Sequence, residues 1–111
     1  MPAYIVARIA ITDPGRYREY VLGSPKVVAQ YGGRFLVRGA EIHTLEGPVE
    51  TRRVVILEFP SLERARAFWD SPEYQRLRKH REGAGDAQFM LLDGYPDAEW
   101  QKAVAGSQPL D

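Results

Sequence analysis

The residue with the clearest chemical potential is Glu58, a carboxylate inside an apolar run between Leu57 and Phe59. A charge buried in such a run is costly unless a cation pairs with it. If the preceding hairpin turn centres on residues 47–50, Arg38 lies within diagonal reach on the neighbouring strand. Either the two form a cross-strand ion pair that fixes the register, or Arg38 anchors a small carboxylate or oxyanion. In the second interpretation, Glu58 orients Arg38 or acts as a base.

The third candidate catalytic residue is His43, near the end of the strand that carries Arg38. Its imidazole can act as a general base over a pocket, but a lone histidine is also common as a partly exposed strand residue. His80 lies in a basic helix end, where cations suit the helix dipole. Neither histidine belongs to a cluster with ligand spacing, so the sequence predicts no metal site.

Aromatic side chains with polar ends form a further group. Tyr17, Trp69 and Tyr74 fall on helical faces that are expected to look toward a sheet. Such side chains pack a core well, and their polar atoms need partners when they are buried. These residues therefore either belong to the core or line a small pocket with polar ends.

The strand that must position Glu58 spans residues 53–59, an apolar run rich in β-branched residues. Such a run, closed by a turn signal, is typical of a strand covered on both faces. Pro60 ends the strand because it has no amide hydrogen, and Ser61 can cap a following helix. Ser71 followed by Pro72 repeats this start signal, so a second short helix is expected.

The remaining elements follow from the same signals. We expect a strand at 3–11, a helix from 13 to 32 with a kink at Pro25, a strand at 33–38 extended over 42–45, a loop at 82–86 and a last strand at 89–92. The order predicts an α+β, ferredoxin-like βαββαβ fold with a four-stranded antiparallel sheet. Residues 1–94 form this domain, and residues 95–111 form a polar tail with one apolar anchor, Trp100, that docks on a neighbour or is disordered.

The helices of this fold cover only one face of the sheet. The other face still carries large apolar side chains, namely Tyr4, Val6, Leu36, Val54, Ile56 and either Met90 with Leu92 or Phe89 with Leu91. Exposed apolar patches of this kind usually mark an interface. We therefore expect a two-fold homodimer whose sheets form a shared barrel, a dimeric α/β barrel. The alternative is a monomer screened by its own tail.

The overall composition limits the partners. Fifteen basic and fifteen acidic residues give a formal net charge of zero, which argues against nucleic acid and anionic membrane. The chain has no cysteine, so it has no disulfide framework and no thiol nucleophile. No signal pattern or spanning apolar run is present, and a cytoplasmic location is expected. We also find no phosphate loop or dinucleotide fingerprint, so no cofactor is predicted.

Three blocks of the sequence resemble one bacterial family, the domain of unknown function numbered thirteen-thirty. The blocks are residues 31–39 (YGGRFLVRG), 53–61 (RVVILEFPS) and 70–75 (DSPEYQ). The resemblance covers about residues 2–94 and implies the fold of the dimeric α/β-barrel superfamily. That superfamily includes cofactor-independent monooxygenases, haem-degrading enzymes, dye-decolourising peroxidases and muconolactone isomerases.

Two functions of different classes remain from this reasoning. In the first, the protein is a small enzyme that converts an aromatic or carboxylated metabolite without a tightly bound cofactor. In the second, it is a non-catalytic dimer that binds a small ligand or serves as a stress-associated module. Fold analogy alone supports the first. An enclosed cavity that holds Arg38 and an unpaired acid or base would favour the enzyme. An Arg38 satisfied by Glu58 would favour the non-catalytic dimer.

Overall fold

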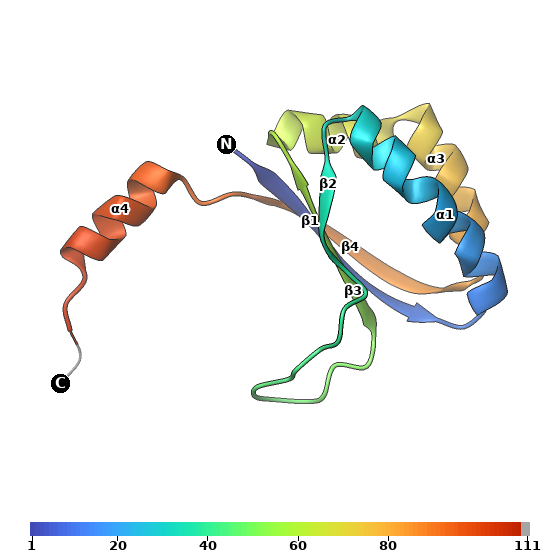
Figure 1. Ribbon diagram of the computed structural model, residues 1–111, viewed down its shortest axis with the longest axis horizontal. Coiled ribbons are helices and arrows are strands. Elements are labelled where there is room, and N and C mark those ends of the chain that lie inside the picture. The colour runs from blue at the N-terminus through green and yellow to red at the C-terminus, as the bar shows by residue number, and fades with distance from the viewer. Residues whose placement is uncertain (110–111) are drawn as a thin grey trace.

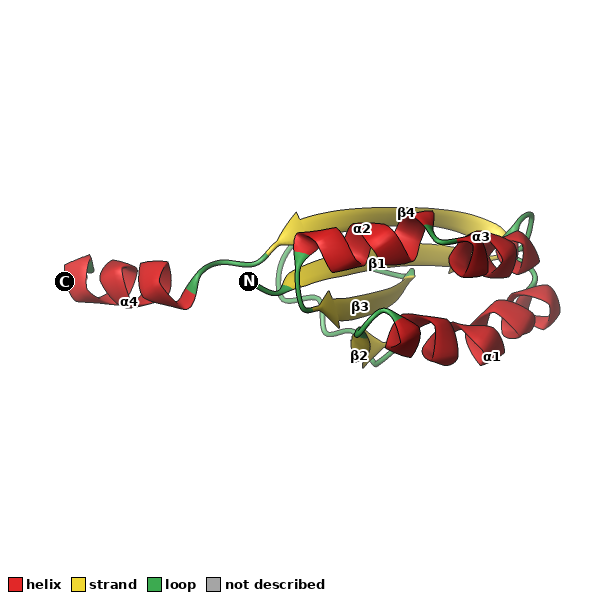
Figure 2. Ribbon diagram, turned by 90° about the horizontal axis from the view of Figure 1, so that it is seen from above, coloured by secondary structure: helices red, strands yellow, loops and turns green. Residues whose placement is uncertain are grey.

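The computed structural model describes residues 1–109 and shows a four-stranded sheet with helices on one face (Figures 1 and 2). The elements are β1 (Ala3–Ile11), α1 (Pro14–Gln30), β2 (Arg34–Arg38), β3 (Arg53–Phe59), α2 (Leu62–Asp70), α3 (Pro72–Arg78), the 3₁₀ turn η1 (Lys79–Arg81), β4 (Gly85–Asp93) and α4 (Asp97–Gly106). The strand order is β2-β3-β1-β4, and every pair of neighbours is antiparallel. This is the predicted ferredoxin-like α+β fold.

The helices begin where their capping residues predict. At each start a side-chain oxygen accepts a hydrogen bond from a free backbone amide of the first turn. The pairs are Asp13 with Arg16 N, Ser61 with Arg64 N and Ser71 with Tyr74 N, each at 3.1 Å. The helix α1 differs from expectation in running through Pro25 as one helix.

The core lies between the sheet and helices α1 to α3. Alternate residues of β1 and β3 point into it, and Phe59 and Tyr74 are its largest fully buried side chains. Phe68 packs between these two, with ring centroids 5.0 Å from Phe59 and 4.6 Å from Tyr74. The predicted aromatic stripe of the helices is therefore mainly core.

A β-bulge in β2 changes the face on which Arg38 lies. Phe35 pairs with Leu57, but Val37 pairs with Ile56, so one extra residue is accommodated between these two pairs. After the bulge Arg38 pairs with Val55, whose side chain faces the helices. The alternation of the sequence predicts Arg38 on the opposite face, and that prediction is wrong because the extra residue inverts the alternation.

The chain also departs from the expected boundaries in three places. Residues 39–52 form a loop without strand pairing, so the predicted strand at 42–45 is absent. The strand β4 begins at Gly85, within the predicted loop. The predicted polar tail contains a helix, α4, which extends away from the sheet (Figures 1 and 2). The last part of the predicted tail, residues 110–111, lies outside the described residues.

The sheet face opposite helices α1 to α3 is here called the open face, and no helix within residues 1–109 covers it (Figure 2). Met90 and Leu92 belong to it, because they pair with Val6 and Tyr4. The apolar residues of the open face are Tyr4, Val6, Val37, Val54, Ile56, Met90 and Leu92.

Within residues 1–109, none of the helices combines the length and the apolar character that crossing a membrane requires.

Candidate functional site

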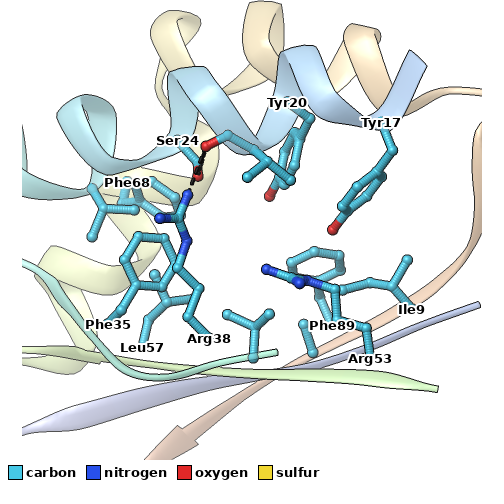
Figure 3. A pocket seen from close by; sticks show the side chains of 14 residues that line it. Ile9, Tyr17, Tyr20, Ser24, Phe35, Arg38, Arg53, Leu57, Phe68 and Phe89 are labelled. Carbon is cyan, nitrogen blue, oxygen red and sulfur yellow. Dashed lines mark hydrogen bonds between the residues drawn. The ribbon is translucent and has the colours of Figure 1, made fainter. Parts of the chain in front are cut away.

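A cavity lies between α1 and the helix-covered side of the sheet (Figure 3). Its free volume is about 30 Å³, which is room for about two water molecules. Most of its wall is apolar, with the aromatic rings of Phe35, Phe68 and Phe89. The polar side chains that reach it are Tyr17, Tyr20, Ser24, Arg38 and Arg53.

Arg38 is held at the cavity by a carbonyl that Pro25 leaves free. Proline has no amide hydrogen, so the carbonyl of Val21, four residues earlier in α1, receives no helical hydrogen bond from position 25. Arg38 Nη2 donates to this oxygen at 2.7 Å, and Ser24 Oγ donates to it at 3.2 Å. The guanidinium also lies over the Phe35 ring, 4.6 Å from its centroid. The bulge therefore turns Arg38 toward the helices, and the carbonyl that Pro25 leaves free holds its guanidinium at the cavity.

Arg53 enters the cavity from the start of β3, on the same face as Val55. Its guanidinium lies against the backbone of Gly39, where an added Cβ would come within 2.2 Å of Nη1. Gly39 also has a positive φ of 67°, a conformation that other residues rarely adopt. The Nε atom of Arg53 is buried and has no hydrogen-bond partner among residues 1–109.

The inner end of the cavity is built from tyrosines. The hydroxyls of Tyr20 and Tyr74 lie 2.9 Å apart, and Arg81 Nη2 donates to the Tyr74 oxygen at 3.2 Å. Tyr17 lies beside Tyr20 and points its hydroxyl toward Arg53 (Figure 3). Burial raises the pKa of Tyr17, an effect that the positive charge of Arg53 partly offsets. Burial also raises the pKa of Tyr20, and the neighbouring Tyr74 adds to the shift. Both hydroxyls are therefore neutral at physiological pH.

The charge of the cavity is positive and uncompensated. Its lining residues include two arginines but no aspartate, glutamate or histidine. In the part of the chain that the structure describes, neither Arg38 nor Arg53 has a carboxylate within 4 Å. Arg53 is half-buried, whereas Arg38 at the rim is exposed, and a half-buried guanidinium normally pairs with an anion. The arrangement can therefore bind an anionic group.

The predicted ion pair between Arg38 and Glu58 does not form. Glu58 lies on the open face, where its Oε1 accepts from Arg34 Nε at 3.0 Å. Glu58 is paired, as its setting required, but with an arginine four residues before the expected one. His43 lies in the loop after β2 with 75% of its side chain exposed, and the nearest acid is Glu41 at 3.8 Å. Neither Glu58 nor His43 lines the cavity.

The expected pocket residues separate into different places. Tyr17 lines the cavity together with Arg38. Trp69 instead lines a second groove between α2 and β4, and Tyr74 is fully buried in the core behind Tyr20. The sequence reasoning missed Arg53 and Tyr20. The position of Arg53, two residues before the buried Val55, was the available signal, because such residues share one face of a strand.

No group of three or more acidic, histidine or cysteine side chains within residues 1–109 has an arrangement that could hold a metal ion. The polar groups of the cavity are hydrogen-bond donors or neutral hydroxyls, which suit an anion and not a cation.

Solved structures with the same fold come from several bacteria. A protein of unknown function from Rhodopseudomonas palustris is 24% identical, with a TM-score of 0.66 over 86% of this chain and 83% of that one. SnoaB from Streptomyces nogalater, described as a cofactor-independent oxygenase, is 14% identical, with a TM-score of 0.61 over 86% and 94%. A putative antibiotic biosynthesis monooxygenase from Caulobacter crescentus is 15% identical, with a TM-score of 0.56 over 86% and 91%. At these identities the likeness shows the fold alone.

Comparison of the sequence with models of known families identifies the family of this chain. No protein of curated function matches the chain. The family model described as "Domain of unknown function (DUF1330)" matches residues 2–95, which include both arginines of the cavity and all four strands. The chain therefore belongs to the DUF1330 family.

Proposed function

We propose that the protein binds a small organic acid in the cavity between α1 and the sheet, with the carboxylate between Arg38 and Arg53. The observation that carries this proposal is the pair of arginines without a carboxylate in a largely apolar cavity. The two guanidinium groups repel each other, and an anion between them would replace this repulsion with charge-assisted hydrogen bonds.

The dimensions of the cavity favour a ligand with a small acidic end. The free volume of about 30 Å³ has room for a carboxylate group. The organic body of the ligand would then lie toward Phe35 and Arg38, on the side of β2, which is one of the two edge strands of the sheet. A larger body needs these rim side chains to move. The aromatic walls favour an apolar or aromatic body.

Binding is better supported than catalysis. A general base near neutral pH is usually a histidine or a carboxylate, and the lining residues include neither. The raised pKa of Tyr17 makes its hydroxyl a hydrogen-bond donor and not a base. Glu58 and His43 lie away from the cavity, so this proposal gives them no catalytic role.

An NMR titration with benzoate tests the proposal, because benzoate combines a carboxylate with a small aromatic body. We expect saturable shifts at residues of the cavity, and none with the neutral benzamide. Arg53→Met removes the charge at similar length. The loss of one charge-assisted interaction, about 1.5–3 kcal/mol, should weaken binding roughly ten- to a hundred-fold.

Two further variants serve as controls. Arg53→Lys keeps the positive charge and should bind benzoate more tightly than Arg53→Met. Arg64→Met removes an exposed arginine of α2 that does not line the cavity, so its affinity should equal that of the wild type. Equal affinities of all four proteins, or equal shifts with benzamide, would refute the proposal.

We also propose that the ligand-binding protein is a homodimer formed through the open face. The open face carries apolar residues from all four strands, and none of the helices in the described part of the chain covers it (Figure 2). A second copy presents the same apolar surface, so two sheets can cover each other. Multi-angle light scattering should therefore give twice the 12.6 kDa of the chain.

The variant Ile56→Glu tests which surface forms the dimer, because it places a charge at the centre of the open face. We expect this variant to be a monomer. The matched control, Leu22→Glu, changes an exposed leucine of α1 on the opposite side of the sheet and should remain a dimer. A mass of 12.6 kDa for the wild type would contradict the dimer.

A further inference from the structure

The helix α4 has an apolar side that no other part of residues 1–109 covers. Trp100 and Val104, one turn apart, are 59% and 54% exposed. The helix has only ten residues, and isolated helices of this length are marginal in water. The helix extends away from the rest of the protein (Figures 1 and 2). Such a helix gains stability when a partner buries its apolar side.

The connection to β4 directs α4 away from its own sheet. Gly94 N donates to the carbonyl of Pro2 at 2.9 Å, so the pairing of β4 with β1 continues beyond the last strand residue. The contact is close, since a Cβ added at Gly94 would lie 2.4 Å from the Pro2 oxygen. Pro96 then keeps an extended conformation, with φ −62° and ψ 138°. In this conformation α4 extends away from β4 and does not fold back over it (Figures 1 and 2).

A groove of matching character lies between α2 and β4. Its free volume is about 350 Å³, enough for a large aromatic side chain. Trp69, Phe89 and Leu91 form its apolar wall on the helix-covered side, and Arg66 contributes a positive charge. Arg78 lies over the Trp69 ring, 5.5 Å from its centroid. Neither arginine has a carboxylate within 4 Å among residues 1–109.

The charges of α4 complement this groove. Asp97 and Glu99 lie in its first turn, next to Trp100. Glu99 contacts Lys102 at 3.6 Å, whereas Asp97 has no basic partner within 4 Å in the described chain. An acidic turn followed by an aromatic anchor is the counterpart of an aromatic groove flanked by arginines.

We infer that α4 packs into the α2–β4 groove of a second copy of this chain, with Trp100 against Trp69 and Leu91 and the acidic first turn near Arg66. The contact lies on the helix-covered side of β4, opposite the open face, and shares Phe89 with the wall of the ligand cavity. This contact and the proposed open-face dimer both need a second copy of the chain. They differ in the surface that the second copy contacts, so an experiment that locates the contact distinguishes them.

A photocross-linking residue in place of Trp100 tests this contact. The variant Trp100→p-benzoylphenylalanine keeps an aromatic side chain that inserts into nearby C–H bonds on irradiation. We expect a covalent dimer of twice 12.6 kDa on a denaturing gel. Peptide mass spectrometry should place the link at Phe89, Leu91 or Trp69.

Charge variants in the same background test the specificity of the link. Arg66→Glu reverses the charge of the groove and should lower the cross-linking yield at least several-fold. Arg64→Glu makes the same change on α2 outside the groove and should leave the yield unchanged. A link within one chain, a link that maps to the open face or to α1, or no link above that of an unirradiated sample would each overturn the inference.

Discussion

The hydroxyl network behind the cavity gives a prediction whose size follows from the structure. Tyr74 is fully buried, and its hydroxyl meets Tyr20 at 2.9 Å and Arg81 at 3.2 Å. Tyr74→Phe therefore removes one neutral and one charge-assisted hydrogen bond. Neutral bonds contribute about 1 kcal/mol and charge-assisted bonds about 1.5–3 kcal/mol to stability. We expect the free energy of unfolding to fall by about 2–4 kcal/mol.

The partner variant Tyr20→Phe removes only the bond between the two hydroxyls. Tyr74 keeps its hydrogen bond from Arg81, so the expected loss is about 1 kcal/mol. In the double variant the shared bond is lost only once. The double-mutant cycle should therefore show a coupling of about 1 kcal/mol between the two positions.

Urea unfolding followed by circular dichroism measures these differences. The protein concentration must be the same for all variants, because the stability of a dimer depends on it. Phe at either position preserves the ring packing with Phe68 and Tyr17, so the effect reports on the hydroxyls. Equal losses for the two single variants, or additive losses in the double variant, would refute this description of the network.

Three further predictions concern other parts of the protein. Because burial raises the pKa of Tyr20, the unfolded chain releases a proton above pH 10 that the folded chain retains; stability should fall there, by up to about 1.4 kcal/mol per pH unit. Urea unfolding between pH 9 and 11 measures this slope, which should be shallower in Tyr20→Phe; an unchanged slope contradicts it. A double-mutant cycle of Glu58→Gln with Arg34→Met should give a coupling of about 0.2–1 kcal/mol, since the arginine is 71% exposed; zero coupling would mean that the pair does not form in solution. Gly33→Ala should cost about 1–3 kcal/mol, because the added Cβ would lie 2.5 Å from the Phe59 ring; a stability equal to wild type in thermal unfolding would exclude this close packing.

The sequence predicted the fold well because local signals agreed with one another. The caps at Asp13, Ser61 and Ser71 define the helix starts, and each makes the expected hydrogen bond. The apolar alternation of the strands identifies the covered face. These signals depend on neighbours within a few residues, so they can be read without the tertiary structure.

The site was less predictable because it depends on a bulge. One extra residue in β2 moves Arg38 to the helix-covered face of the sheet. Neither Leu36 nor Val37 is a residue type that predicts a bulge. The expected partner of Glu58 was consequently wrong, although the need for a cation was correctly recognised. Arg53 was overlooked although its place two residues before Val55 puts it on the covered face of β3; only its contact with Gly39 needs the tertiary structure. Such contacts join segments far apart in the chain.

The central claim is that Arg38 and Arg53 together bind the carboxylate of a ligand. The most direct measurement follows the side-chain Nε–Hε signals of these two arginines in ¹⁵N-labelled protein during a benzoate titration. The Nε of Arg53 is buried and has no hydrogen-bond partner within residues 1–109, so its signal should shift saturably, together with that of Arg38 and with one dissociation constant. Signals of both arginines that stay unchanged while benzoate saturates the protein, or that move no more than the signal of Arg64, would contradict the claim.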